Sequence, residues 1–199
     1  RCNTEYFGDY IMAGTLSVQK IQGLASSATP TTVEVSSGHV LQAPGHVIQV
    51  VSSTLTSAVT GTGTSIVDTG LTATITPTSA SNKVYVNGYI TLGTQTFFTY
   101  CWLVRGSTQI FKGDAASSRP VVTIAGPQYA GGHEIYGFEP TPFQYLDSPS
   151  TTSATTYKIQ IRQYGSQAWY VNRTHQDRDN ADYEPRGTSV ITLMELSLI

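Results

Sequence analysis

Apolar and polar residues alternate at every second position along most of the chain after residue 45. The clearest case is the stretch 155–164, in which Thr155, Tyr157, Ile159 and Ile161 share one face and Thr156, Lys158, Gln160 and Arg162 the other. Because successive side chains of a strand point to opposite faces of a sheet, this period predicts half-buried β-strands.

Ten stretches carry such a strand pattern, and turns rich in Gly, Pro, Ser and Asn separate them. They are 46–52, 71–77, 82–92, 96–105, 108–113, 120–126, 133–139, 155–164, 167–172 and 189–197. No stretch of ten or more residues has the period of an amphipathic helix. The pattern therefore predicts an all-β protein, an antiparallel two-sheet sandwich of the jelly-roll type.

Two of these strands are apolar on both faces. The stretch 96–105 predicts a central strand that is buried on both sides, followed by a tight turn at Arg105-Gly106-Ser107. In 189–197, Val190, Met194 and Leu196 share one face, while Ile191 and Leu193 share the other. Such a strand is too apolar for an exposed edge, so we expect it to be covered on both sides.

The first 45 residues differ from the rest of the chain. Apolar positions in 13–45 are too sparse for a core of their own, although Val33 and Val35 flank Glu34 in one short strand pattern. We expect residues 1–45 to form an N-terminal extension and attachment arm, and 46–199 to form the jelly-roll domain. Met12 resembles a translation start, and no secretory signal is expected because the first residues lack an apolar run.

Composition supports strands and excludes several classes of partner. The chain has 29 Thr and 20 Ser, whereas only 12% of its residues are charged and the net charge is −2. With no stripe of Lys and Arg, nucleic acid is not an expected partner. No apolar run reaches the length of a membrane span.

Cys2 and Cys101 lack metal-ligand spacing, and two free thiols are expected rather than a disulfide.

Motifs of catalysis and metal binding are missing from the sequence. The four histidines lack ligand spacing, and there is no nucleophile elbow of the G-x-S-x-G type. The glycine-rich stretch 61–65 lacks the Lys of a phosphate loop and is interpreted as a hairpin tip. We therefore expect no catalytic residue, no metal and no cofactor, and the protein is not expected to be an enzyme.

Charge is concentrated in one stretch near the C-terminus, where seven of the fourteen residues from 173 to 186 are charged. They are Arg173, Asp177, Arg178, Asp179, Asp182, Glu184 and Arg186. Four carboxylates could bind Ca²⁺, but their spacing does not fit a calcium loop and arginines lie between them. Ion pairs that hold a loop are the favoured interpretation, within one subunit or at a subunit boundary.

Trp169 and Tyr170 are candidates for a second kind of site. Aromatic faces can stack on the C–H groups of sugars, so these residues are candidate glycan contacts. Strand aromatics more often pack in a core or an interface, and that interpretation stays open beside the first.

Several stretches together resemble a family of virion structural proteins of marine bacteriophages, of the tail-fibre-like type. They are LSVQKIQGLAS, GHVIQVV, ITPTSASNKVYV, LVRGSTQIFKGDAASSR, YLDSPSTTSATTYKIQ and YVNRTHQDRDNADYEPRGTSVITLMELS. The resemblance covers Met12 to Ser197. It implies an arm followed by a jelly roll similar to the trimeric domains of the tumour necrosis factor and complement type.

On this basis we expect a homotrimeric virion subunit, as a fibre, spike or capsid decoration. The arm would attach to capsid or tail proteins, and the jelly roll would be exposed on the particle. The alternative is a host-glycan-binding module of a tail fibre, which predicts exposed aromatic side chains near Trp169 and Tyr170.

Overall fold

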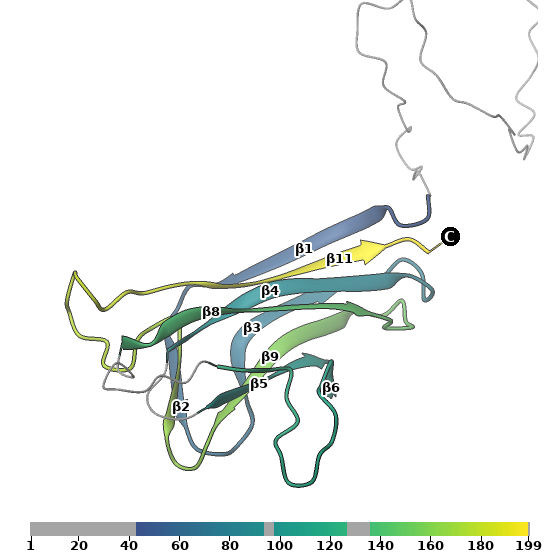
Figure 1. Cartoon of the computed structure of the whole chain (residues 1–199). Coiled ribbons are helices and arrows are strands. Elements are labelled where there is room, and N and C mark those ends of the chain that lie inside the picture. Colours follow the sequence, from purple (N-terminus) through teal and green to yellow (C-terminus); the bar gives the residue numbers. More distant parts are fainter. Residues whose placement is uncertain (1–42, 94–97, 127–135, 199) are drawn as a thin grey trace, which may run out of the picture. The chain divides into compact units, whose positions relative to one another are not determined.

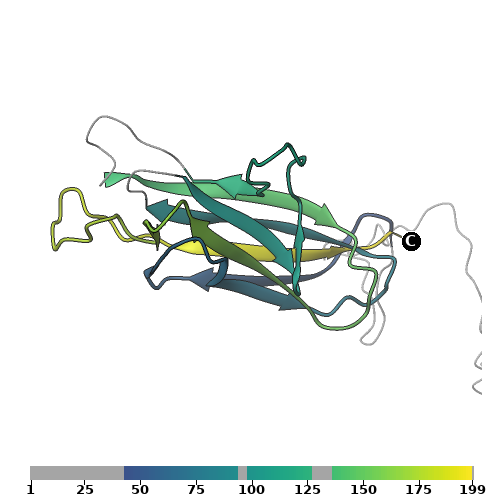
Figure 2. The ribbon, with the colours of Figure 1, turned by 90° about the horizontal axis from the view of Figure 1, so that it is seen from below.

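The computed structural model describes residues 43–93, 98–126 and 136–198, which form two antiparallel sheets packed face to face (Figures 1 and 2). The first sheet contains β1 (Val47–Leu55), β11 (Ser189–Leu196), β4 (Lys83–Gly93), β8 (Phe138–Asp147), β10 (Ala168–Val171) and β2 (Val59–Thr62). The second contains β3 (Val67–Ile75), β9 (Thr155–Gln163), β5 (Thr99–Arg105), β6 (Thr108–Ile110) and β7 (Ile124–Ala125). Within these residues, no helix has the length and apolar character needed to cross a membrane.

The order of the strands is that of a jelly roll. Pairing runs β1-β11-β4-β8 in the first sheet and β3-β9-β5-β7 in the second, always antiparallel. The short strands β10 and β2 extend the first sheet beyond the end of β4, where Tyr170 is opposite Gly93. Eight main strands in two sheets with this order confirm the predicted all-β jelly-roll sandwich.

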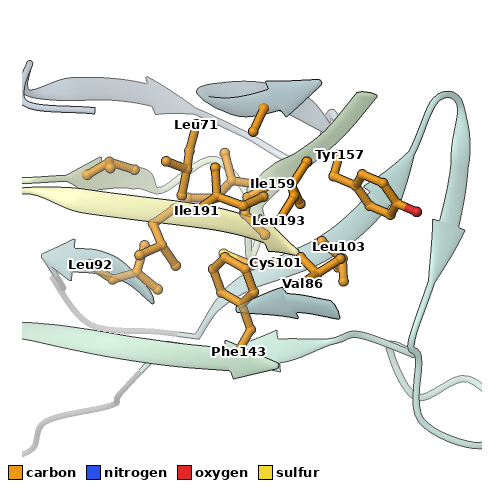
Figure 3. Close-up of a cluster of buried hydrophobic side chains, with 14 of the residues drawn as sticks. Leu71, Val86, Leu92, Cys101, Leu103, Phe143, Tyr157, Ile159, Ile191 and Leu193 are labelled. Carbon is orange, nitrogen blue, oxygen red and sulfur yellow. The ribbon is translucent and has the colours of Figure 1, made fainter. Parts of the chain in front are cut away.

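The core consists of the inward-facing rows of both sheets (Figure 3). Tyr157, Ile159 and Ile161 of β9 are completely buried, as are Ile191 and Leu193 of β11. Each alternates with a residue that is only partly buried, which is the burial pattern of a sheet with one face on the core. The alternation seen in the sequence therefore predicted correctly which side chains point inward.

Strand β5 is buried on both faces, as its sequence predicted. Cys101 and Leu103 face the core, while Trp102 and Val104 are buried on the other side. The indole of Trp102 donates a hydrogen bond to the carbonyl oxygen of Val121 at 2.7 Å. At Trp102, the outer face of β5 is therefore covered by the connection between β6 and β7, which belongs to the same chain.

Residues 133–135 of the predicted strand 133–139 lie outside the described residues, and the sequence did not predict the strand that follows. The observed strand, β8, covers Phe138–Asp147, and it contains Pro140 and Pro142. Proline has no N–H to donate, so two prolines argue against a strand unless it lies at an edge. Among the described residues, β8 pairs with β4 alone, and the two prolines remove donors from its other edge, which disfavours pairing with a foreign strand.

The stretch 61–65 is not a hairpin tip. Strand β2 pairs with β10 in the first sheet, whereas β3 pairs with β9 in the second, so this stretch connects the two sheets. The turn at Gly106 and Ser107 does form the predicted hairpin, in which Arg105 is opposite Thr108. Gly106 has a φ of 58°, a conformation that favours glycine.

The two ends of the sandwich differ (Figure 1). At one end the described chain begins with a turn from Ala43 to His46, in which His46 donates its N–H to the carbonyl oxygen of Ala43 at 3.1 Å. The N–H of Gly45 is bonded to the carbonyl oxygen of Ser197, so this end, called the arm end below, also holds the C-terminal residues. The opposite end, called the loop end, holds the connection between β10 and β11.

A buried carboxylate joins three segments at the arm end. Glu195 of β11 is completely buried and has no cationic partner in the described chain. Its Oε1 accepts hydrogen bonds from Asn82 Nδ2 at 2.6 Å and from the N–H and hydroxyl of Thr78 at 2.7 and 2.8 Å, and its Oε2 accepts one from Gln49 at 2.5 Å. Burial alone would raise the pKa of Glu195, but the hydrogen bonds from Asn82, Gln49 and Thr78 outweigh it and hold the pKa below its usual range.

A second buried carboxylate at the same end is held differently. Both oxygens of Asp147 accept hydrogen bonds from Arg105 Nη1, at 2.9 and 2.8 Å, and Oδ2 also accepts one from the Tyr157 hydroxyl at 2.6 Å. Burial and the neighbouring Asp147 raise the pKa of Tyr157, so this phenol stays neutral and keeps donating. The contact ties β8, β5 and β9 together where all three reach the arm end.

We predict that Glu195→Gln will lower the free energy of unfolding at pH 7 by about 2–3 kcal/mol, because the bonds from Asn82 and Thr78 lose their charged acceptor and the new NH₂ group stands against the donor of Gln49. Chemical denaturation measures this loss. Glu139→Gln, at an exposed position on β8, is the control and should change nothing.

The same substitution tests the pH dependence. Since the pKa of Glu195 is lower in the folded state, its contribution is present above the ordinary carboxyl pKa of about 4.3 and is lost as the pH falls through the lower folded value. The wild type should therefore lose more stability between pH 7 and pH 3 than Glu195→Gln does. Parallel pH curves for the two proteins would contradict this account.

Candidate functional site

The charged loop, residues 172–188, connects β10 to β11 at the loop end (Figure 1). Asn172 anchors its start: the side-chain amide donates to the carbonyl oxygens of Leu55 and Ser57 at 2.7 and 3.1 Å, and Oδ1 accepts from the Ser189 hydroxyl at 2.7 Å. Asn172 is completely buried and has a φ of 60°, which asparagine tolerates better than most residues. Sequence reasoning missed this residue, although an Asn between a strand and a loop is a recognisable signal.

Asp177 is shared by the two arginines at the ends of the charged stretch. Its Oδ2 lies 3.5 Å from Nη1 of Arg173 and also pairs with Nη2 of Arg186. Arg173 and Arg186 are paired through an isolated backbone bridge as well, so the carboxylate closes the base of the loop. These contacts lie within one chain, which is one of the two arrangements that the sequence left open.

Glu184 forms the second centre of the loop. Its carboxylate accepts hydrogen bonds from the Thr174 hydroxyl and from Arg178 Nε, the latter at 2.9 Å. The bond from Thr174 and, after it, the bond from Arg178 hold the pKa of Glu184 below its usual range, against the effect of burial. The loop is therefore fixed at two carboxylates on opposite sides of its tip.

Asp179 and Asp182 have a different environment from the other charged residues. Both are exposed, and no ion pair to either is found in the described part of the chain. The N–H of Asp182 is bonded to the side chain of Asn180 at 2.9 Å, so the tip has its own local turn. Of the seven charged residues predicted as a group, five are paired and these two carboxylates face solvent.

The candidate glycan contacts were wrong. Trp169 and Tyr170 are only 4% and 7% exposed, because Trp169 belongs to the core and the ring of Tyr170 is packed against Arg173 and His175. Trp169 packs over Gly61, where a Cβ would overlap the indole ring. Neither ring can offer a face to a sugar, and the exposed aromatics that the alternative function requires are not at these positions.

Two other tyrosines at the loop end are exposed. Tyr136 and Tyr183 are 39% and 45% exposed, and their rings meet edge to face with centroids 5.4 Å apart. The guanidinium of Arg178 lies over both rings, 5.6 Å from the Tyr136 centroid and 5.2 Å from that of Tyr183. Sequence reasoning missed this pair, since nothing in the chain links position 136 to position 183.

The loop end also holds a half-buried histidine. The centroid of the His175 ring lies 5.2 Å from that of Tyr170, and burial together with Arg173 lowers the pKa of His175.

Among the described residues, no three His, Cys, Asp or Glu side chains are close enough together to hold a metal ion. Cys101 is buried with a free thiol, and its pKa is raised by burial. Cys2, His39 and His133 lie outside the described residues.

Comparison with known proteins adds little to this description. No family model matches the chain, and no curated protein does. Among solved structures, the chain is similar to one from the structure of the infectious bursal disease virus Gx strain, with 12% identity and a TM-score of 0.38. The match covers 85% of this chain and 42% of the viral chain, so this chain spans less than half of that protein. A likeness this distant decides nothing about function.

We predict that Asp177→Asn will lower the free energy of unfolding by about 1 kcal/mol, equivalent to about 2–4 °C in Tm, because it removes the charge shared by Arg173 and Arg186. Asparagine accepts the positive φ of this position, so the change isolates the charge. Asp179→Asn is the matched control, and calorimetry should show no change for it. Equal melting curves for the two variants would show that the ion pairs do not hold the loop.

Proposed function

We propose that this protein is a structural subunit of a virus particle that assembles into a homotrimer through the outer face of its first sheet. Residues 1–45 would form the arm that attaches the subunit to capsid or tail proteins, with the jelly roll exposed. The resemblance of the chain to phage virion proteins supports the viral role and the trimer. Self-assembly is supported by the apolar side chains on the outer face of the first sheet.

The outer face of the first sheet is unusually apolar for a surface. One row crosses all four main strands, from Val50 on β1 through Met194 and Tyr85 to Leu146 on β8. Both ends of this row, Val50 and Leu146, are exposed. Isolated apolar residues are common on surfaces, but a continuous row across a sheet indicates a contact surface.

A second apolar row lies four residues further along the strands. It contains Val190, Tyr89 and Pro142, and a polar row of Ser52, Thr192, Asn87 and Gln144 separates it from the first. A hollow of about 500 Å³ lies beside the second row, lined by Tyr89, Thr91, Phe138, Pro140, Pro142 and Thr188. Between the two rows, Ser52 and Thr192 bond to each other through their hydroxyls at 3.0 Å. Lys83, opposite Leu196 in the row beyond the first, is the only charged residue among the outward-facing described residues of β1, β11, β4 and β8.

The second sheet has an outer face of the opposite character. Strand β3 presents Thr72 and Thr74, and β9 presents Lys158 and Gln160, which both bond to the carboxylate of Asp68 at 2.7 and 2.9 Å. Such a face is stable in water. The contrast between two faces of one sandwich supports a partner on the first sheet alone, and a second copy of the chain supplies a complementary apolar surface.

The arm end supports the proposed attachment. The described chain begins with the turn from Ala43 to His46, which is bonded to Ser197 at the end opposite the charged loop. An arm attached to a particle from this end would leave the charged loop pointing away from the attachment point. That arrangement fits an exposed subunit of a fibre, spike or decoration.

We predict that the purified 199-residue chain has three times its mass of 21.4 kDa in light scattering after size exclusion at micromolar concentration. The double variant Val50→Lys with Leu146→Lys should raise the dissociation constant of the trimer at least about a hundredfold, because unpaired buried charges cost several kcal/mol. The control Thr72→Lys with Thr74→Lys adds the same charges to the second sheet and should leave the trimer intact.

Two results would contradict the proposal. A wild-type monomer at these concentrations would remove self-assembly, and equal dissociation of both double variants would move the contact away from the first sheet. Circular dichroism of each variant checks that the strands are retained.

A further inference from the structure

We propose that the loop end carries a binding site for a neutral hexose unit of a polysaccharide, formed by Tyr136, Tyr183 and the hollow of the charged loop. This inference goes beyond the self-assembly proposed above and does not rest on it. It rests on the described residues of one chain.

The aromatic part of the site is the exposed pair Tyr136 and Tyr183. Their edge-to-face arrangement sets the two rings at 88° to each other, so they present surfaces in two directions at one corner of the molecule. A pyranose ring has an apolar face of C–H groups, which packs on such rings. Each phenol also has a hydroxyl beside its ring for the sugar hydroxyls.

Arg178 fixes this pair in place. It lies against both rings, and its Nε is bonded to the buried carboxylate of Glu184 at 2.9 Å. Glu184 is itself held by Thr174, so a chain of contacts leads from the folded base of the loop to the exposed rings. Side chains ordered before a ligand arrives lose less entropy on binding, which favours recognition by a small surface.

A polar hollow lies next to the rings and shares Arg178 with them. Its volume is about 340 Å³, within the range of small-molecule sites, and it is lined by Asp177, Arg178, Asp179, Asn180, Ala181, Glu184 and Arg186. The Asp179 carboxylate is exposed there, without an ion pair among the described residues. The Asn180 side chain uses its oxygen in the local turn, which leaves its NH₂ group as a donor.

The charges of the hollow favour a hydroxylated ligand over an ionic one. Asp177 and Glu184 are already paired with arginines, so the cations are not free to bind a phosphate or another anion. A single unpaired carboxylate, Asp179, is too little to hold a metal ion. What remains is one acceptor and one amide donor beside two aromatic faces, and this set fits the vicinal hydroxyls and apolar face of a neutral sugar.

The test uses saturation-transfer difference NMR on the whole 199-residue chain, with trisaccharides of glucose, mannose and galactose in both α and β linkage as probes. At least one of these should receive saturation. Tyr183→Ala and Asp179→Ala should each weaken its binding about tenfold or more, the loss expected from one aromatic contact or one hydrogen bond to a charged group. Tyr164→Ala, at another exposed tyrosine in the connection between β9 and β10, is the control and should bind normally.

Three results would overturn the inference: no saturation of any probe, unchanged binding by Tyr183→Ala, or loss of binding in EDTA, which would indicate a bridging cation. Each variant is also measured by calorimetry and light scattering. A variant that keeps its Tm and its mass but loses the sugar shows a binding defect. A change of mass alone concerns the proposed assembly and not this site.

Discussion

Each main strand of the sandwich places one row of side chains between the two sheets, and this shared core fixes the register of every pairing. A shift of one residue would turn side chains such as Ile159 and Leu193 from the core into water. Each of them would lose about 1.5–3 kcal/mol of burial energy, so the correct register is strongly preferred. The positions of the exposed residues follow from the same constraint, because every inward side chain has outward neighbours.

The constraint leaves the two outer faces free to differ, and they do. The outer face of the second sheet is compatible with water because it presents threonines, Lys158 and Gln160. The outer face of the first sheet instead presents an apolar row that crosses all four of its main strands. At the arm end, charge is buried only where donors surround it: three residues donate to Glu195, and Arg105 and Tyr157 donate to Asp147. The arm end is therefore stabilised by hydrogen-bonded buried carboxylates, whereas the outer face of the first sheet is suited to contact with a partner.

The loop end holds a network of ion pairs together with exposed carboxylates and tyrosines. Ion pairs at Asp177 and Glu184 hold a loop whose tip keeps Asp179, Asp182 and Tyr183 accessible, beside the exposed Tyr136. A loop stabilised from within is suited to recognition, because a rigid scaffold positions it while its tip stays in water. Assembly and recognition would then use different parts of one subunit, and variants can separate them.

The alternating pattern by itself determined the fold class, the inward face of most strands and the double burial of β5, since a period of two has only one interpretation in a sheet. It could not determine β8, because Pro140 and Pro142 are tolerated only at an edge and sequence does not reveal which strand is an edge. Nor could it show that Trp169 and Tyr170 are both buried, because the side chains that cover each face of a short strand come from other segments of the fold. The tertiary structure decided the site, since Tyr136 and Arg178 are brought together by the packing of distant segments.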